Sequence, residues 1–173
     1  MTGAYIRDGA RSAADDRGIV RVRDLLTSER VKVPLDGQDK DAIVAELADA
    51  VVRAKGLETQ RAEILTAVRQ REEVLSTGIG EGVALPHAKY NGLDELVMAA
   101  GVSLEPIEFG ALDGKPVRLF FLMLGPDTTA GTQVRVLSRI SRLMRDSAFR
   151  EELVAAEDAD HFLRVLEEAE RAI

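Results

Sequence analysis

The chain has 173 residues with 46% hydrophobic and 31% charged residues, a formal net charge of −7 and no cysteine. This length suits one domain with a real core, the lack of cysteine excludes disulfides and cysteine-ligated metals, and the acidic balance disfavours nucleic acid as a partner. No apolar run approaches the ~20 residues that a membrane span needs, so we expect a cytoplasmic protein without direct membrane insertion.

The first half of the chain predicts a leader, a strand and two helices. Residues 1–20 are small, polar and of mixed charge, and we expect a disordered leader there, followed by one domain over residues 21–173. A short helix is expected over residues 22–27, and the alternation of VKVPL predicts a strand. Apolar residues at helical spacing predict a helix in DKDAIVAELADAVVRAKG, ended by Gly56, and a second helix in ETQRAEILTAVRQREEVLS.

The second half predicts three strands followed by helices. GVALPHA is strand-like although its proline cannot donate to a sheet. LVMAAGVSLEPIEF predicts a buried strand that bends near Pro106, GALDGKP a turn, and VRLFFLMLGP the central strand. DTTAGT is expected to be a loop, and QVRVLSRISRLMRD, FREELVAA and HFLRVLEEAERAI predict helices. This order predicts an α/β fold, a single domain in which a small mixed β-sheet is sandwiched between helices.

The stretch STGIGEGVALPHAKYN, residues 76–91, places three glycines just before His87, one of only two histidines. The glycine spacing and the helix-to-strand order fit neither a Rossmann nor a Walker loop. Glycines instead allow backbone N–H groups to approach an anion, and Pro86 fixes the direction in which the chain enters His87. An imidazole with one nitrogen held as N–H by a carbonyl keeps a lone pair that can attack phosphorus. The stretch therefore predicts a phosphoryl acceptor.

STGIGEGVALPHAK resembles the active-site signature of the enzyme IIA domains of the fructose/mannitol class (type 2) of the phosphoenolpyruvate-dependent sugar phosphotransferase system, a class that includes nitrogen-regulatory proteins. The resemblance spans roughly residues 20–172 and includes RVRDLLTSERVKVPL, RQREEVLSTGIG, LDGKPVRLFFLMLGP and LSRISRLMRD. It implies that His87 accepts a phosphoryl group from an HPr-type phosphocarrier protein. The group then passes to a IIB domain, or serves as a regulatory state towards a target protein.

The resemblance thus implies a histidine phosphocarrier that needs no cofactor and no metal. Because the chain carries neither a membrane domain nor a IIB domain, we expect the nitrogen-regulatory type rather than a component of sugar transport.

Carried over residue by residue, the family's active-site arginine is Arg71, whose guanidinium would pair with phosphate oxygens. Thr77 would donate its hydroxyl to the phosphate, and Glu81 would point away because its charge repels phosphate. Many family members carry a second histidine where this chain has Gln133, 46 residues after His87 (133 − 87). Glutamine can donate a hydrogen bond, but it cannot carry a positive charge or shuttle a proton.

Each of these residues has a structural alternative. Arg71 could lie on a solvated helix face, Thr77 could be a turn residue, and Gln133 could simply start a helix. His161 is expected at a helix N-terminus capped by a nearby aspartate, without a functional role. The alternative function is a binding module that keeps the IIA fold, has lost phosphotransfer and regulates a partner protein. A metal enzyme is disfavoured, because two histidines 74 residues apart (161 − 87) and no cysteine give no ligand set.

Overall fold

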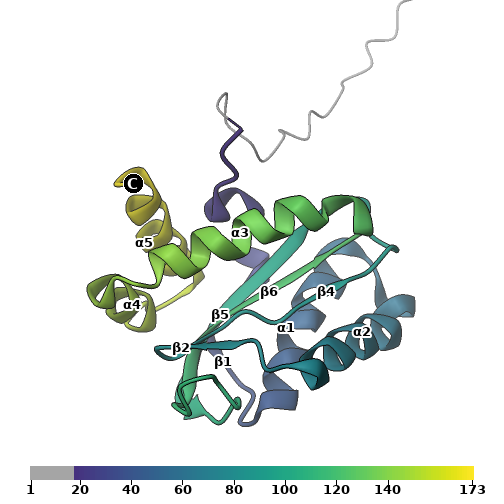
Figure 1. Ribbon diagram of the computed structural model, residues 1–173, viewed down its shortest axis with the longest axis horizontal. Coiled ribbons are helices and arrows are strands. Elements are labelled where there is room, and N and C mark those ends of the chain that lie inside the picture. Colours follow the sequence, from purple (N-terminus) through teal and green to yellow (C-terminus); the bar gives the residue numbers. More distant parts are fainter. Residues whose placement is uncertain (1–17) are drawn as a thin grey trace, which may run out of the picture.

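The computed structural model describes residues 18–173, which form a six-stranded mixed sheet covered by helices on both faces (Figure 1). The strands are β1 (Val31–Leu35), β2 (Gly78–Gly80), β3 (Val83–Ala84), β4 (His87–Lys89), β5 (Val97–Ile107) and β6 (Val117–Gly125). The α-helices are α1 (Lys40–Lys55), α2 (Arg61–Val74), α3 (Ala130–Leu143), α4 (Ser147–Val154) and α5 (Ala159–Arg171). Short 3₁₀ helices are η1 (Val22–Leu25), η2 (Ser28–Arg30), η3 (Glu58–Gln60) and η4 (Asp127–Thr129).

Strand β6 lies at the centre of the sheet, as its apolar sequence predicts. On one side it pairs antiparallel with β5, which in turn pairs in parallel with β1. On its other side, β3 and then β4 pair with it in parallel, and β2 pairs antiparallel with β3. The segment that carries His87 therefore runs along the central strand, and its position depends on that strand.

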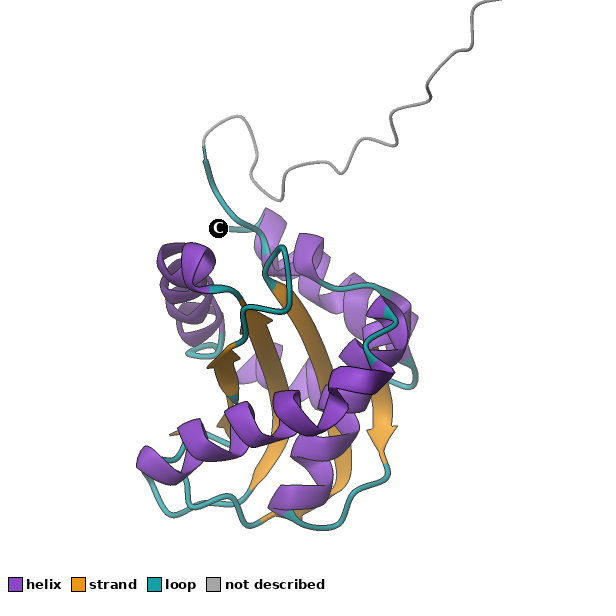
Figure 2. Ribbon diagram, turned by 90° about the vertical axis from the view of Figure 1, so that its right-hand side faces the viewer, coloured by secondary structure: helices purple, strands orange, loops and turns teal. Residues whose placement is uncertain are grey.

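Alternation along the strands divides the core into two layers, and helices lie over each face of the sheet (Figures 1 and 2). Successive side chains of a strand point to opposite faces of the sheet. Leu119, Phe121 and Met123 of β6 pack with residues of α3, α4 and α5. Phe120 and Leu122, which alternate with them, pack with residues of α1 and α2. Because both faces of β6 are buried, its sequence is a continuous apolar run.

Most predicted elements are present, with bounds set by local chemistry. Helix α1 begins after Asp39, whose side chain accepts a hydrogen bond from the Ala42 N–H, and it ends at Gly56, whose φ is 65°. The pairing of β5 with β6 shifts register between Val102 and Ile107, the region of the predicted bend.

Three predicted elements differ from the structure. GVALPHA contains β3 and the start of β4 rather than one strand, because Pro86 has no N–H to donate. The Pro86 carbonyl still accepts a hydrogen bond from the Met123 N–H of β6. The predicted helix over residues 22–27 is the short 3₁₀ turn η1. DTTAGT is not a loop but contains η4 and the start of α3, since small polar residues are also common at helix N-termini.

The predicted leader, residues 1–20, lies mostly outside the described residues. Its last residue, Val20, is partly buried and packs against the core layer beneath α3, α4 and α5. Within residues 18–173, no helix is both long and apolar enough to cross a membrane. The same residues contain no group of three or more acidic, histidine or cysteine side chains placed to hold a metal ion.

Candidate functional site

His87 opens strand β4, and its ring is half-buried. The Nδ1 atom lies 2.8 Å from the carbonyl oxygen of Leu85. A carbonyl can only accept, so this hydrogen bond places the proton on Nδ1 and leaves the lone pair on Nε2. The imidazole therefore has the tautomer that nucleophilic attack by Nε2 requires.

The surroundings of His87 favour its neutral form. Burial lowers the pKa of the ring, and the positive charge of Arg71 lowers it further. The hydrogen bond to Leu85 and the negative charge of Glu72 act in the opposite direction without reversing the shift. Near neutral pH the ring is therefore uncharged, which keeps the lone pair available.

His87 opens into a hollow of about 440 Å³ bounded by α2, β4 and α3. Its lining combines cationic and amide side chains with an apolar rim: Ala67, Arg71, His87, Ala88, Lys89, Ala130, Gln133, Val134 and Leu137. Three of the four residues predicted for phosphate chemistry thus meet here from separate parts of the sequence.

Arg71 lies in the last turn of α2, and its Nη1 donates to the Leu75 carbonyl at 2.9 Å. This bond anchors one edge of the guanidinium at the helix end. Within the described chain, Nε and Nη2 make no hydrogen bond, so they are available to an anion in the hollow.

Gln133 lies in the first turn of α3 and is only 6% exposed. Its side-chain amide makes no hydrogen bond to any described residue, and it is not among the fully buried polar groups without a partner, so it is accessible from the hollow that it lines. The N-terminal end of α3 also borders the hollow at Ala130, and helix N-termini favour negative charge. An anion bound to His87 would therefore find an amide donor and a favourable helix dipole.

Thr77 does not line this hollow. Its hydroxyl donates to Oε2 of Glu72 at 2.5 Å, and its backbone N–H donates to Oε1 at 2.9 Å. The threonine is 5% exposed, so this geometry gives no support to a direct contact with phosphate.

The glycine-rich turn also differs from its expected role. Gly80, Glu81 and Gly82 all have positive φ (99°, 56° and 78°) and connect β2 to β3. The Glu81 N–H donates to Asp113 at 2.9 Å, and none of these residues lines the His87 hollow. The geometry therefore gives no support to the expectation that the backbone N–H groups of this turn bind an anion beside His87.

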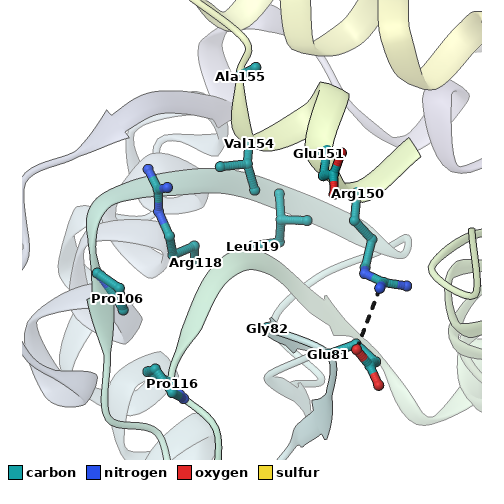
Figure 3. A pocket seen from close by; sticks show the side chains of 10 residues that line it. All are labelled: Glu81, Gly82, Pro106, Pro116, Arg118, Leu119, Arg150, Glu151, Val154 and Ala155. Atoms are coloured by element: carbon teal, nitrogen blue, oxygen red, sulfur yellow. Dashed lines mark hydrogen bonds and ion pairs between the residues drawn. The ribbon is translucent and has the colours of Figure 1, made fainter. Parts of the chain in front are cut away.

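As expected, Glu81 points away from the histidine: its exposed carboxylate lies 3.4 Å from a guanidinium nitrogen of Arg150 (Figure 3). This pair borders a separate hollow of about 560 Å³ between the β2–β3 turn, β6 and α4.

Comparisons with known proteins show the family to which this chain belongs. The model of the family described as phosphoenolpyruvate-dependent sugar phosphotransferase system, EIIA 2, matches residues 24–169. The chain belongs to this family. A nitrogen regulatory protein of Bradyrhizobium diazoefficiens is 33% identical over 145 residues, which cover 84% of this chain and 94% of that protein.

Two further similarities are to a fructose-specific component and to a second nitrogen regulatory protein. A fructose-specific EIIABC component of Bacillus subtilis is 29% identical over 152 residues, which cover 88% of this chain but only 24% of that protein. The crystal structure of nitrogen regulatory protein IIA-Ntr of Neisseria meningitidis matches with a TM-score of 0.77 at 28% identity, covering 84% of this chain and 98% of that one. The predicted family and α/β fold are therefore confirmed.

One residue of this candidate site was not predicted from the sequence. Lys89 lines the His87 hollow, and its Nζ lies 4.0 Å from the exposed carboxylate of Asp127. The signal was the strand period, because residues two apart in a strand share a face, and Lys89 follows His87 by two in β4. A lysine there adds a second positive charge to the hollow.

Proposed function

We propose that His87 accepts a phosphoryl group on Nε2 from an HPr-type phosphocarrier protein and passes it to a IIB-type domain or holds it as a regulatory state. The observation that supports this most directly is the Nδ1 hydrogen bond to Leu85, which leaves Nε2 free beside the hollow. Arg71 and Gln133 would bind the phosphoryl oxygens there, whereas Thr77 would act on the ring only indirectly.

The transfer balances without a cofactor. A bond forms between phosphorus and Nε2 of His87, while the phosphorus–nitrogen bond to the donor imidazole breaks and that ring leaves with the electron pair. The proton on Nδ1 stays in its hydrogen bond to Leu85 throughout. Onward transfer is the same step in reverse, with the receiving domain supplying the nucleophile.

The regulatory version of this function is supported by the similarity to nitrogen regulatory proteins, of which that of Bradyrhizobium diazoefficiens is 33% identical over 145 residues. Gln133 points the same way, because an uncharged donor stabilises the transferring phosphoryl group less than a protonated histidine would. A slower onward transfer suits a protein whose phosphorylated state is a signal.

The test is incubation with phosphoenolpyruvate, enzyme I and HPr, followed by phosphorus NMR. We expect one acid-labile, alkali-stable phosphate on the wild type and on His161→Ala, and none on His87→Ala. His161 is a suitable control because it lies at the start of α5, where its backbone N–H is capped by Asp158. No incorporation into the wild type, or full incorporation into His87→Ala, would refute the proposal.

The second candidate is a binding module that keeps the fold without phosphotransfer, and Gln133 is the observation that favours it. In that case wild type and His87→Ala would bind a regulatory target equally, and neither would take up phosphate. A phosphomimetic or phosphorylated form with altered target affinity would instead support the signalling role.

A further inference from the structure

We propose that Glu72 is a positioning residue that fixes the tautomer and orientation of His87 through Thr77 and Leu85. The kinetic part of this inference rests on the proposed phosphotransfer, whereas its structural part concerns the ring alone. Glu72 and Arg71 are consecutive on α2 but face different partners. The last turn of α2 would thus supply both Arg71, which binds the phosphate, and Glu72, which positions the nucleophile His87.

The first step is the pair of hydrogen bonds that Glu72 accepts from Thr77. The Glu72 side chain is 8% exposed, and its two oxygens accept from the Thr77 N–H, the Thr77 hydroxyl and Nζ of Lys40. Burial alone would raise the pKa of this carboxyl, but the hydrogen bonds from Lys40 and Thr77 outweigh burial and lower it. Glu72 therefore stays charged, and a charged acceptor makes the stronger hydrogen bonds.

The second step runs from Thr77 to the histidine. The Thr77 carbonyl accepts from the Leu85 N–H at 3.0 Å, and the Leu85 carbonyl accepts from Nδ1 of His87 at 2.8 Å. The Leu85 side chain is 3% exposed, and the next carbonyl, that of Pro86, accepts from the Met123 N–H of β6. Leu85 is thus held by burial and by Thr77, and its neighbour Pro86 is held by the central strand.

Through these hydrogen bonds, Glu72 affects the tautomer and the orientation of the His87 ring. If Thr77 moves, the Leu85 N–H loses its acceptor, the backbone at Leu85 is less constrained, and the Leu85 carbonyl can turn away from Nδ1. The imidazole then exchanges between its two neutral tautomers, and only the form with the proton on Nδ1 can attack through Nε2. Loss of Glu72 would reduce the reactive fraction without touching the phosphate.

The experiment compares Thr77→Val, which keeps the shape and removes the hydroxyl, with Thr77→Ser, which restores it, and with Glu72→Gln. Glu72 joins α2 to α1 through its ion pair with Lys40. Arg69→Gln is the matched control, because Arg69 also joins α2 to α1, through an ion pair with Asp41 at 2.8 Å, without contacting Thr77. Nitrogen-15 NMR of the imidazole reports the tautomer. Phosphorylation by purified phospho-HPr gives kcat and KM separately, and thermal unfolding reports stability.

We expect Thr77→Val and Glu72→Gln to raise the fraction with the proton on Nε2 and to lower kcat by about 3- to 10-fold at unchanged KM, the range for losing one hydrogen bond. Thr77→Ser and Arg69→Gln should remain within about twofold of wild type. A folded Thr77→Val with wild-type tautomer and kcat would overturn the inference, as would an equal loss in Arg69→Gln.

The experiment distinguishes a failure of the variants to fold from a failure of the proposed phosphotransfer. Should Glu72→Gln fail to fold, the Thr77→Val and Thr77→Ser pair still decides the question. Should the wild type take up no phosphate, the proposed phosphotransfer fails while the tautomer measurement still tests the positioning by Glu72.

Discussion

At the scale of single residues, the lowered pKa of His87 makes a testable difference to the pH dependence of phosphorylation. Burial is the main cause and the charge of Arg71 adds to it. An ordinary histidine loses half of its neutral form at about pH 6.5. We therefore expect the rate of phosphorylation by purified phospho-HPr to stay level as the pH falls through this value and to decline only at lower pH.

The lowered pKa of His87 also determines how this residue makes the free energy of unfolding depend on pH. The unfolded chain binds a proton at His87 near pH 6.5, whereas the folded chain does so only at lower pH, so the contribution of His87 is complete above this range and is lost as the pH falls towards the folded pKa. Imidazole NMR titration gives the folded pKa directly. A midpoint at or above pH 6.5 in both the NMR titration and the rate would contradict the assignment.

Gln133 offers a second residue-scale prediction, Gln133→His. A protonated imidazole beside phosphate makes a charge-assisted hydrogen bond, which is stronger than that of an amide by roughly 1 kcal/mol. We expect onward transfer to a IIB-type domain to be about fivefold faster. Gln133→Leu, which removes the donor, should be slower than wild type in the same assay. Equal rates in all three would show that position 133 does not contact the phosphoryl group.

The sequence predicted three of the residues that line the His87 hollow, but it did not predict the partner of Thr77. His87 and Arg71 carry local motif signals, and Gln133 was found at the position of a family histidine. The partner of Thr77 was not predicted, because both phosphate and a buried carboxylate can accept from a hydroxyl, and only the folded chain shows that Glu72 accepts from it.

At the scale of elements, the sequence predicted the helices and strands whose apolar residues form a clear pattern. It did not predict a strand that depends only on pairing with its neighbour. The apolar spacing of α1 and the continuous apolar run of β6 identified both elements. The three-residue strand β2 could not be found this way, since its Gly-Ile-Gly sequence has little alternation and the strand exists only by pairing with β3.

The β2–β3 turn gives a prediction for stability. Glu81 has φ 56°, a conformation that costs a residue with a side chain roughly 1–2 kcal/mol, but less for asparagine, which tolerates it well. Its exposed ion pair with Arg150 at 3.4 Å contributes little. We expect Glu81→Asn to raise the free energy of unfolding by about 0.5–1 kcal/mol in urea.

The control for this prediction is Glu81→Ala. Alanine also removes the ion pair with Arg150 but keeps the unfavourable φ, so it should be neutral or slightly destabilising. If asparagine and alanine had the same effect, the backbone conformation of Glu81 would not be the source of the gain.

At the scale of the whole molecule, the two ends of the described chain are joined by one buried carboxylate. Glu170 of α5 is 4% exposed. It accepts from the backbone N–H groups of Val22 and Arg23 at 2.9 Å each, and from Nε of Arg139 on α3 at 2.6 Å. These contacts hold the first turn of the domain, η1, against the helical layer that includes α3, whose first turn borders the His87 hollow.

Replacing this carboxylate should therefore weaken the whole domain. Glu170→Ala leaves two backbone N–H groups and the Arg139 guanidinium without their partner, and breaking a buried ion pair costs about 3–5 kcal/mol. Glu167→Ala is the matched control, because Glu167 pairs with Arg171 on the exposed side of α5 and such pairs contribute about 0.3–0.5 kcal/mol. Urea unfolding of the two variants measures the difference. A loss below about 1 kcal/mol in Glu170→Ala would mean that η1 is held to the domain by its apolar contacts rather than by this carboxylate.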